Sequence, residues 1–375
     1  MKSSQITIIG CGLIGGSIAL ALKRRRPEIS VVCLDLPDRL SAIQEAAVSD
    51  QVGTLDDAAK YLPESSIVIL ATPVQTILDT LAYIRPWLRA GAIVTDVGST
   101  KKMITSEARK LIPPGVHFIG GHPMAGSEHS GVEAADPLLF SDRVYILCPY
   151  QDTPPGALLT LIDLAESLLA FPITMDPEEH DRIMAMVSHV PQLISVALMY
   201  AALKGDAEHG MLDKLAGRGF LDMTRLSASA YGIWKGILAT NAEAIRDAIE
   251  RFKECLAILS GGGEELALLW EQAARRRRKM SADSIPRPRR QDLRSMIDRY
   301  DKHILTALGH RIEIARKIGR IKKSQSAPVV DPEREKRMLQ QRKMWGESVN
   351  LPADMVEEIF AVILKHSSRI QSENL

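Results

Sequence analysis

Eight polar or charged residues in the last quarter of the sequence are spaced in a way that a solvated surface does not require. An apolar stripe covers residues 293–321 at alternating intervals of three and four positions, which is typical of one buried helix face. Arg311 takes the position of this stripe between Ala307 and Ile314, and Lys322 follows about three helical turns later. Because an unpaired buried charge is very costly, these two cations predict a site for an acidic ligand inside a helical bundle.

The other members of this cluster also have helical spacing. Asp331, Arg334 and Glu335 share one helix face, and Pro332 just after Asp331 suits a helix start. Ser367 and Gln371 are four residues apart on a later helix, and Arg294 is a single cation near the start of the first helix. The alternative is a helical bundle whose charges are merely solvated or paired with one another. A cation in an otherwise regular apolar stripe favours the ligand site over that alternative.

Residues 291–374 resemble the all-helical chorismate mutase family without a gap, with all eight polar positions occupied. The resemblance implies an all-α three-helix domain that forms an intertwined dimer and converts chorismate to prephenate. It implies that Arg311 and Lys322 hold the substrate carboxylates, and that Lys322 and Gln371 reach the ether oxygen. It also implies that Glu335 and the backbone of Asp331 hold the ring hydroxyl. Arg334 and Ser367 would complete the pocket, and Arg294 would come from the partner subunit.

This set of residues suits such a rearrangement, which needs neither a nucleophile nor a proton transfer. A fixed reactive conformer helps, and so does positive charge where the breaking C–O bond becomes negative. A helix over residues 293–324 would be about 48 Å long, too long for a domain of this size to cover alone, so a dimer is expected. The alternative for this tail is a regulatory or dimerisation module with a degenerate mutase site.

The start of the sequence has the pattern of strand, glycine turn and helix, as in a dinucleotide-binding site. Gly10 allows the tight turn, Gly12 lets the backbone approach a pyrophosphate, and Gly15 permits close packing of helix on strand. An acid at the end of the second strand suits the ribose hydroxyl of NAD, although Arg39 leaves NADP open. The predicted NAD-binding residues are Gly10, Gly12, Leu13, Ile14, Gly15, Asp35, Thr72 and Pro73.

Two loops at the carboxyl ends of strands carry the predicted chemistry of this front part, because ligands bind there in open α/β sheets. They cover residues 96–101, with Ser99, and residues 120–127, with His122. A histidine among glycines at such a place is expected to face the ligand, and its ordinary pKa suits proton transfer near neutral pH. The alternative for this histidine is a hydrogen bond that stabilises the loop. The weaker candidates are His117, His129, His180 and His189.

Residues 1–272 resemble the prephenate dehydrogenase family, most specifically in the stretch GGHPMAGSEHSG. The resemblance implies an NAD-dependent oxidative decarboxylation of prephenate to 4-hydroxyphenylpyruvate. It implies that His122 accepts the proton of the substrate hydroxyl, Ser99 orients His122, and Arg225 binds the ring carboxylate. Two more residues are expected to line the substrate pocket: His189, and Gln192 where some relatives have a second histidine. The alternative is an arogenate or cyclohexadienyl dehydrogenase.

The elements that must position these residues follow from the hydrophobic pattern. Short apolar runs predict strands at residues 6–9, 31–34, 67–71, 92–96, 117–120 and 144–148. With helical segments between the earlier strands, they predict an α/β Rossmann-type doubly wound sheet. The pattern from 175 to 272 is helical, with a long apolar helix at 183–203. The predicted domains are 1–172 for NAD binding, 173–274 for a helical substrate and dimerisation domain, 275–290 for a linker and 291–375 for the mutase.

The composition is that of an ordinary globular protein with a net charge of +1, which implies no general attraction to nucleic acid or membranes. The four cysteines are scattered without a CxxC pair, and three of them lie in or beside apolar strand-like runs, which predicts buried free thiols. We predict no metal site. We expect no signal peptide and no apolar run of membrane-spanning length, so a cytoplasmic enzyme is predicted. The expected partners are the small substrates chorismate and prephenate, and a second copy bound through both helical domains.

Overall fold

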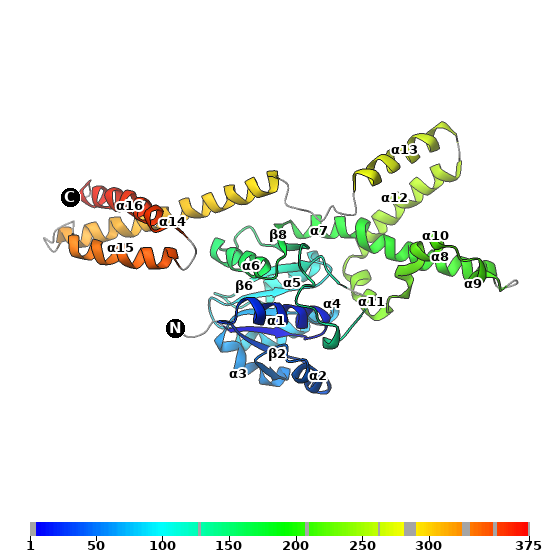
Figure 1. Cartoon of the computed structure of the whole chain (residues 1–375), viewed down its shortest axis with the longest axis horizontal. Helices are drawn as coiled ribbons and strands as arrows, with labels where there is room; N and C mark the ends of the chain where they lie inside the picture. The colour runs from blue at the N-terminus through cyan, green and yellow to red at the C-terminus, as the bar shows by residue number, and fades with distance from the viewer. Residues whose placement is uncertain are drawn as a thin grey trace. The chain divides into compact units, whose positions relative to one another are not determined.

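The computed structural model divides the chain into two compact units, Met1–Arg287 and Pro288–Leu375 (Figure 1). The described residues are 5–126, 129–206, 210–261, 263–280, 290–324, 331–347 and 351–373. Within these ranges, the side chains of 264–265, 290–300, 302–303, 306, 324, 332, 347 and 373 lie outside the description. We call the first unit the head and the second unit the tail.

An eight-stranded sheet forms the centre of the head, in the order β3-β2-β1-β4-β5-β6-β7-β8 (Figure 1). Neighbouring strands are parallel except for β6 and β7, which are antiparallel to each other. The strands are β1 (Gln5–Ile9), β2 (Ser30–Leu34), β3 (Gln51–Gly53), β4 (Ser65–Leu70), β5 (Ile93–Asp96), β6 (His117–Pro123), β7 (Val144–Cys148) and β8 (Phe171–Thr174). The six predicted strands are confirmed. The sequence analysis missed β3, which has only three residues, and β8, which contains a proline.

Helices cover both faces of this sheet, which confirms the predicted doubly wound fold. One apolar core lies between the sheet and helices α1 and α6, and a second lies between the sheet and helices α4 and α5. These helices are α1 (Leu13–Arg25), α6 (Pro155–Ser167), α4 (Val74–Ile84) and α5 (Lys102–Leu111), with the shorter α2 (Leu40–Glu45) and α3 (Ala58–Tyr61). Parallel strands that are buried on both faces need apolar residues at nearly every position, which explains the short apolar runs in the sequence.

The rest of the head is helical, as predicted. It contains α7 (Pro177–Met184), α8 (Val190–Asp206), α9 (Leu212–Leu215), α10 (Arg218–Thr224), α11 (Tyr231–Thr240), α12 (Ala242–Gly261) and α13 (Glu264–Lys279). A π-helical turn, Ala185–His189, joins α7 to α8 without a break. Such a turn carries one residue more than an α-helical turn and is often found at functional sites. The predicted apolar helix is therefore present, but it is wider at this point.

This continuous helix, Pro177–Asp206, is long and apolar enough to cross a membrane by length and composition alone. The expectation that no apolar run reaches that length is therefore wrong. Three of its polar side chains, those of His189, Gln192 and Ser195, are only 1%, 4% and 1% exposed inside the head. These buried polar groups have hydrogen-bond partners inside the head, as buried polar groups require.

Three helices form the tail, as predicted: α14 (Arg290–Ser324), α15 (Pro332–Glu347) and α16 (Ala353–Glu373). With 35 residues, α14 is about 52 Å long. Part of its apolar stripe is uncovered in the single chain, as expected for a helix that one domain cannot cover, and Ile304, Ile314 and Ile321 are 57%, 56% and 54% exposed. The physical reason is length, since α15 and α16 have only 16 and 21 residues and leave part of α14 uncovered.

The beginning of the predicted linker at 275–290 is helical. Its basic run, Arg275 to Lys279, forms the last turns of α13, where cations interact favourably with the helix dipole. Residues 281–289 lie outside the described residues.

Candidate active sites

The glycine turn between β1 and α1 has the shape that a dinucleotide requires. Gly10 has a φ of +93°, and a Cβ atom there would lie 2.7 Å from the backbone that follows β4. A Cβ on Gly15 would lie 2.0 Å from the Gly10 oxygen, whereas one on Gly12 would meet nothing within 4 Å. Gly12 caps α1 without a side-chain hydrogen bond, and the helix begins with Leu13 and Ile14, whose N–H groups have no partner within the helix. The open side of this turn can therefore receive a phosphate.

Asp35 and Thr72 follow β2 and β4, the strands on either side of β1. The Asp35 carboxylate accepts hydrogen bonds from the backbone N–H groups of Cys11 at 2.6 Å and Leu36 at 2.7 Å, which fixes the acid beside the glycine turn. The Thr72 hydroxyl is buried and has no hydrogen-bond partner among the described residues. Pro73 directly precedes α4. A fixed acid, an unsatisfied hydroxyl and an open glycine turn at one edge of the sheet fit a bound dinucleotide.

His122 lies in strand β6 and not in the loop after it, so its predicted placement is wrong. The antiparallel pairing with β7 extends β6 and sets His122 opposite Ile146. The side chain is half-buried, and burial lowers the pKa of His122 well below its usual value, with further lowering by His180, Lys101 and His189. A histidine that is neutral at pH 7 can accept a proton, which is what the predicted base must do.

Two buried residues of α7 lie behind His122. His180 Nε2 is 2.8 Å from His122 Nδ1, with the two rings edge to face, and His180 Nδ1 is 2.7 Å from Asp181 Oδ1. His180 and Asp181 are 0% and 2% exposed. The sequence analysis ranked His180 among the weaker candidates and did not single out Asp181. Their signal was a neighbouring His-Asp pair in a helix, and only the tertiary packing of α7 shows that the pair reaches His122.

A buried ion pair joins the two predicted catalytic segments. Lys101 Nζ contacts the Asp96 carboxylate and donates to the carbonyl oxygen of Gly121 at 2.7 Å, while Asp96 accepts from the Gly121 N–H at 3.1 Å. Both side chains of the pair are fully buried. Because Gly121 precedes His122 in β6, the pair fixes the loop of Ser99 next to the strand of His122.

Ser99 lies half-buried in the loop between β5 and α5. Its hydroxyl makes no hydrogen bond to His122 among the described residues, and the neighbour of His122 Nδ1 is His180. The predicted orienting contact from Ser99 is therefore replaced at this nitrogen by one from α7. A contact between Ser99 and the other ring nitrogen stays a prediction.

His189 is a packed interior residue of the π turn. Its Nδ1 atom lies 3.2 Å from Asn241 Nδ2, and its ring is edge to face with Trp234 at a centroid distance of 6.1 Å. Burial lowers the pKa of His189 to about 4, which nearby His180 also favours and Asp181 opposes. The ring is therefore neutral at pH 7, and its predicted contact with substrate stays a prediction.

Gln192 holds the turn that carries Arg225. Its Nε2 donates to the carbonyl oxygen of Leu226 at 2.8 Å, and its Oε1 accepts from the hydroxyl of Ser229 at 3.1 Å. The turn, Arg225–Ala228, follows α10 and begins with Arg225, whose side chain is exposed. Gln192 thus positions the segment of Arg225, and direct contact of either side chain with substrate stays a prediction.

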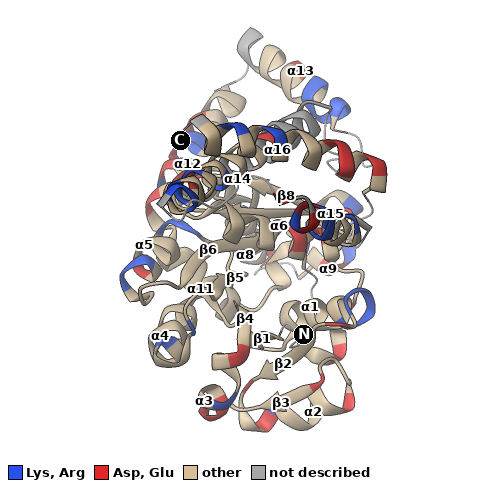
Figure 2. Ribbon diagram, turned by 90° about the vertical axis from the view of Figure 1, so that its left-hand side faces the viewer, with Lys and Arg blue, Asp and Glu red and all other residues tan. Residues whose placement is uncertain are grey.

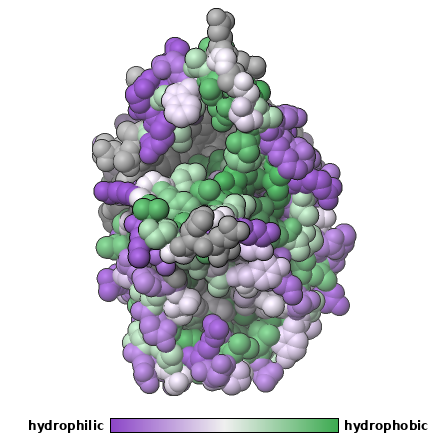
Figure 3. Space-filling view, turned by 90° about the vertical axis from the view of Figure 1, so that its right-hand side faces the viewer, coloured by the Kyte–Doolittle hydropathy of each residue, from purple (hydrophilic) through white to green (hydrophobic). Residues whose placement is uncertain are grey.

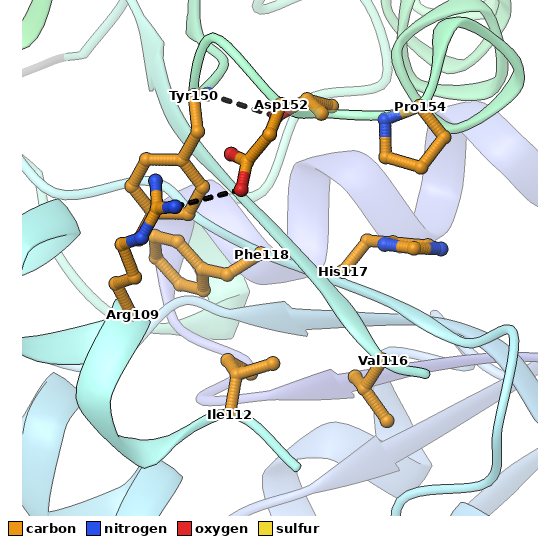
Figure 4. A pocket seen from close by; sticks show the side chains of 9 residues that line it. Arg109, Ile112, Val116, His117, Phe118, Tyr150, Asp152 and Pro154 are labelled. Atoms are coloured by element: carbon orange, nitrogen blue, oxygen red, sulfur yellow. Dashed lines mark hydrogen bonds and ion pairs between the residues drawn. The ribbon is translucent and has the colours of Figure 1, made fainter. Parts of the chain in front are cut away.

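A small cavity of about 150 Å³ at the other end of β6 does not belong to this site (Figure 4). It is lined by Arg109, His117, Tyr150 and Asp152 among others. The Arg109 guanidinium bonds to Asp152 at 2.7 Å and lies 4.8 Å from the centre of the Tyr150 ring. His117 begins β6, and His122 lies five residues along the strand, about 17 Å away. The charges of this cavity are already paired with each other.

In the tail, the predicted polar residues converge on one cavity of about 320 Å³. Figure 2 shows the charged residues along its helices. The cavity brings together seven of the eight predicted residues from all three helices: Arg311, Lys322, Asp331, Arg334, Glu335, Ser367 and Gln371. Arg294 lies in α14, and its side chain is outside the described residues.

Arg311 and Arg342 are two cations of this cavity that influence each other. Burial lowers the pKa of Arg311, and the charge of Arg342 adds to this effect. Arg311 also donates a hydrogen bond to the hydroxyl of Ser367. Arg342 was not predicted as a member of this cavity. Its guanidinium lies 4.1 Å from the centre of the Trp345 ring and 5.8 Å from that of Phe360. Arg342 lies seven residues after Glu335 and eight after Arg334, and this helical spacing could have indicated that it faces the same cavity.

The cavity also contains an unsatisfied acceptor. The side-chain oxygen of Gln371 is buried without a hydrogen-bond partner among the described residues. Asp331 directly precedes α15 and accepts at Oδ1 from the N–H of Arg334 at 3.0 Å, which orders the start of this helix. Fixed cations beside a free amide oxygen suit a ligand that carries both carboxylates and a hydroxyl group.

The fold and the sites together define a dinucleotide-dependent dehydrogenase with a candidate histidine base, joined in one chain to a helical domain whose cavity is lined by cations. Residues 18–171 match the family model described as prephenate dehydrogenase, nucleotide-binding domain. Residues 176–261 match the model of the prephenate dehydrogenase dimerization domain, and residues 293–372 match that of chorismate mutase type II.

Three known dehydrogenases are similar to the head. The prephenate dehydrogenase of Lactococcus lactis subsp. cremoris is 37% identical over 254 residues, which cover 67% of this chain and 69% of that enzyme. The cyclohexadienyl dehydrogenase of Zymomonas mobilis subsp. mobilis is 30% identical over 293 residues, 76% of this chain and 98% of that enzyme. A crystal structure of prephenate dehydrogenase from A. aeolicus, in complex with hydroxyphenyl propionate and NAD+, has a TM-score of 0.70 at 28% identity and covers 75% of this chain and 99% of that chain. The chain therefore belongs to the prephenate dehydrogenase family.

The tail has relatives of its own. It is 41% identical over 73 residues to the isochorismate pyruvate lyase of Pseudomonas aeruginosa, covering 20% of this chain and 71% of that enzyme. The three family models, in their order along the chain, confirm the predicted prephenate dehydrogenase followed by a chorismate mutase domain.

Proposed function

We propose that the chain catalyses two successive reactions, with chorismate converted to prephenate in the tail and prephenate oxidised by NAD in the head. The observation that carries this proposal is the cavity of the tail, which gathers cations and an unsatisfied amide around the space that one small dicarboxylate would need. The product expected there is the substrate that a prephenate dehydrogenase domain uses. The reaction proposed for the tail therefore supports the reaction proposed for the head.

In the head, the chain supplies a base and anchors at the carboxyl ends of β1, β4, β5 and β6. NAD, when bound, supplies the acceptor for a hydride from C4 of the substrate. His122 takes the proton of the C4 hydroxyl, and the ring carboxylate leaves as carbon dioxide while the ring becomes aromatic. We assign Arg225 to the binding of that carboxylate. The contact should not fully neutralise its charge, because the group must leave as carbon dioxide. Ser99 is assigned to the substrate side of His122.

The substrate and the cofactor can be tested together. We propose NAD over NADP because Asp35 would repel a 2′-phosphate, and prephenate over arogenate on the family resemblance. Purified enzyme should be supplied with each substrate and each cofactor in turn, and reduction of the cofactor followed at 340 nm. A higher kcat/KM with arogenate, or with NADP, would replace that part of the proposal.

In the tail, the residues hold a reactive conformer and stabilise charge. Arg311 and Lys322 are assigned to the carboxylates, while Lys322 and Gln371 are assigned to the ether oxygen whose bond breaks. Glu335 is assigned to the ring hydroxyl with the backbone of Asp331, and Arg334 with Ser367 completes the pocket.

A second candidate reaction for the tail is the release of pyruvate from isochorismate, which its identity to a lyase of that name favours. Chorismate and isochorismate should be supplied separately, with prephenate and pyruvate as the measured products. Pyruvate from isochorismate without prephenate from chorismate would assign the tail to the lyase reaction.

The decisive experiment uses the intact chain with chorismate and NAD as the only substrates. We expect NADH and 4-hydroxyphenylpyruvate to form together after a short lag, while prephenate accumulates and is then consumed. If added prephenate yields NADH but chorismate does not, the tail is a regulatory or dimerisation module and the bifunctional proposal is wrong.

We also infer a homodimer formed through both helical regions. The head exposes large apolar side chains on α8, α9 and α13, with Tyr200, Leu215 and Trp270 exposed by 60%, 74% and 70%, and Figure 3 shows hydrophobic side chains gathered on this face. In the tail, the uncovered apolar stripe of α14 is the surface proposed to bind the second copy. Light scattering on a size-exclusion column tests the assembly, and a monomer at micromolar concentration would contradict it. A cytoplasmic location goes with this proposal, since the long apolar helix Pro177–Asp206 buries His189, Gln192 and Ser195 inside the head.

A further inference from the structure

Three side chains of the head form a hydrogen-bonded row, which we call the relay: His122 of β6, then His180 and Asp181 of α7. We propose that His180 and Asp181 are positioning residues for the dehydrogenase. They hold His122 in the tautomer whose Nε2 can take the substrate proton, and His180 accepts the Nδ1 proton of His122 as that happens. This inference rests on the proposed role of His122 as the base.

The tautomers follow from the end of the relay. Asp181 Oδ1 accepts from the backbone N–H of Lys101 at 2.7 Å, and its Oδ2 accepts from that of Lys102 at 3.0 Å, so both oxygens act as acceptors, as those of a carboxylate do. A carboxylate can only accept, and His180 must therefore donate to it from Nδ1. A neutral His180 then has its lone pair on Nε2, which must accept from His122 Nδ1. His122 is left with an unprotonated Nε2.

The surroundings of His122 explain why such a relay is useful. Burial makes an isolated charged imidazole costly at this place, and Lys101 adds like charge from nearby. A buried base that kept the whole positive charge would be a weak one. If the Nδ1 proton moves to His180, the charge comes to lie against the Asp181 carboxylate, where it is paired.

The reaction releases no net proton, so the relay needs no path for protons to solvent. The substrate O–H bond breaks and an N–H bond forms at His122 Nε2, while the Nδ1–H bond breaks and an N–H bond forms at His180 Nε2. The hydride from C4 reduces NAD, and the electron pair of the lost carboxylate enters the ring. The oxygen then needs its proton back to become a phenol, so the same two transfers run in reverse. No net proton is released, which agrees with the full burial of His180 and Asp181.

Asp181 has a second role that a test must separate from the first. Its bonds to the N–H groups of Lys101 and Lys102 cap the start of α5, so replacing it would disturb this helix. His180 is the better target, because its two ring nitrogens bond to His122 and Asp181 alone among the described residues.

The test compares two substitutions of His180 with a control at His117. His180→Phe removes the acceptor and keeps the ring, whereas the amide oxygen of His180→Gln can accept from His122 Nδ1 but cannot take its proton. We expect dehydrogenase kcat to fall about 100-fold in the Phe variant and less in the Gln variant, with KM for prephenate and for NAD within about twofold of wild type. The control His117→Gln, at the far end of β6, should be unchanged.

A spectroscopic measurement reads the tautomer directly, without substrate or cofactor. In the full chain with 15N-labelled histidine, the nitrogen shifts of His122 should show a proton on Nδ1. The Phe variant should show an increased share of the form protonated on Nε2, because its Nδ1 proton has lost the acceptor. A purely structural role for His180 would change the melting temperature without moving this equilibrium.

Two results would overturn the inference: a kcat of His180→Phe within about threefold of wild type in a variant that melts as a folded protein, or a wild-type His122 protonated on Nε2. If the Phe variant does not fold, the Gln variant and the wild-type spectrum decide. The parallel variant His122→Asn separates this inference from the proposed function. If His122→Asn keeps its turnover, the base assignment itself is wrong, whereas loss in His122→Asn with none in His180→Phe contradicts the relay alone.

Discussion

The head surrounds its candidate base with fully buried titratable side chains, whereas the tail arranges half-exposed cations around an open cavity. His180 and Asp181 are 0% and 2% exposed behind His122, while Arg311 and Lys322 keep partial access to solvent. The two proposed reactions explain the difference. A proton transfer needs a base whose protonation is controlled, and burial provides that control. A rearrangement without proton transfer needs only fixed positive charge, which an arginine keeps even when its pKa is lowered.

The two sites also differ in how much of each one chain supplies. In the head, a buried ion pair and the relay connect β5, β6, α5 and α7 within one unit. In the tail, the apolar stripe of α14 remains uncovered, and the proposed role of Arg294 requires a partner subunit. A single chain can therefore form the proton-transfer site, whereas the mutase site is expected to depend on assembly.

The largest effect is expected from His122→Asn, which removes the base and keeps a polar side chain of similar size. We expect dehydrogenase kcat to fall about 1,000-fold, with little change in NAD affinity and none in mutase rate. The measurement is NADH formation from prephenate, with chorismate disappearance as the internal control. A fall of less than about tenfold, roughly 1.4 kcal/mol of barrier, would mean that another group is the base.

Arg311→Ala tests the other half of the comparison. We expect mutase kcat/KM to fall at least about 100-fold, because the variant loses a fixed cation and its bond to Ser367, while dehydrogenase turnover stays the same. Arg320→Ala is the matched control, since Arg320 is an exposed cation of the same helix. Equal mutase rates in the two variants would remove Arg311 from the site.

A change of pH tests how burial affects the stability of the head. His189 has its pKa lowered to about 4, so below its ordinary value the unfolded chain binds a proton that the folded head does not. Stability that is present at pH 7 is therefore lost as the pH falls through the unfolded value of about 6.5 towards 4, by about 2 kcal/mol at pH 5. Urea unfolding of wild type and His189→Gln at both pH values measures this contribution. An equal pH dependence in the two proteins would show that His189 does not make it.

The smallest effect is expected from Arg342→Gln, which removes the cation that lies over Trp345 at the cavity of the tail. We expect KM for chorismate to rise about threefold to tenfold, with kcat nearly unchanged, because a half-buried charge at the cavity contributes about 1 kcal/mol of binding. Arg337→Gln is the control, since Arg337 is exposed on the same helix. A fall in kcat equal to that of Arg311→Ala would place Arg342 beside the breaking bond.

The sequence predicted the elements that have a strong period and the residues that belong to known motifs. The glycine turn, six strands and the three helices of the tail follow from local pattern, because each is decided by residues close together in the chain. Seven residues of the tail were predicted together because helical spacing places them on facing sides of neighbouring helices. The exposure of Ile304, Ile314 and Ile321 in a single chain follows from the length of α14, whereas periodicity says only which face is apolar and not what covers it.

The parts that were missed depend on contacts between distant segments. His180 lies 58 residues from His122, and nothing in the local pattern of α7 indicates that it faces β6. The strand position of His122 depends on antiparallel pairing with β7, which glycines in its segment made hard to anticipate. The hydrogen bonds from the amide of Gln192 to the turn after α10 were not predicted either, while its contact with substrate stays a prediction. In each case, tertiary packing decides the role of a polar side chain.

The π turn lets the helix Pro177–Asp206 hold one residue more without changing the direction in which its two ends face. The N–H of Val190 bonds to the carbonyl of Ala185, five residues earlier, so this turn holds one residue more than a regular helix. Because the wider turn takes up the extra residue locally, its loss would restore a regular helix while α8 kept nearly the same orientation relative to α7. Gln192 and Ser195 would still face the segment of Arg225 that they hold. The change would fall on the turn itself, which carries His189.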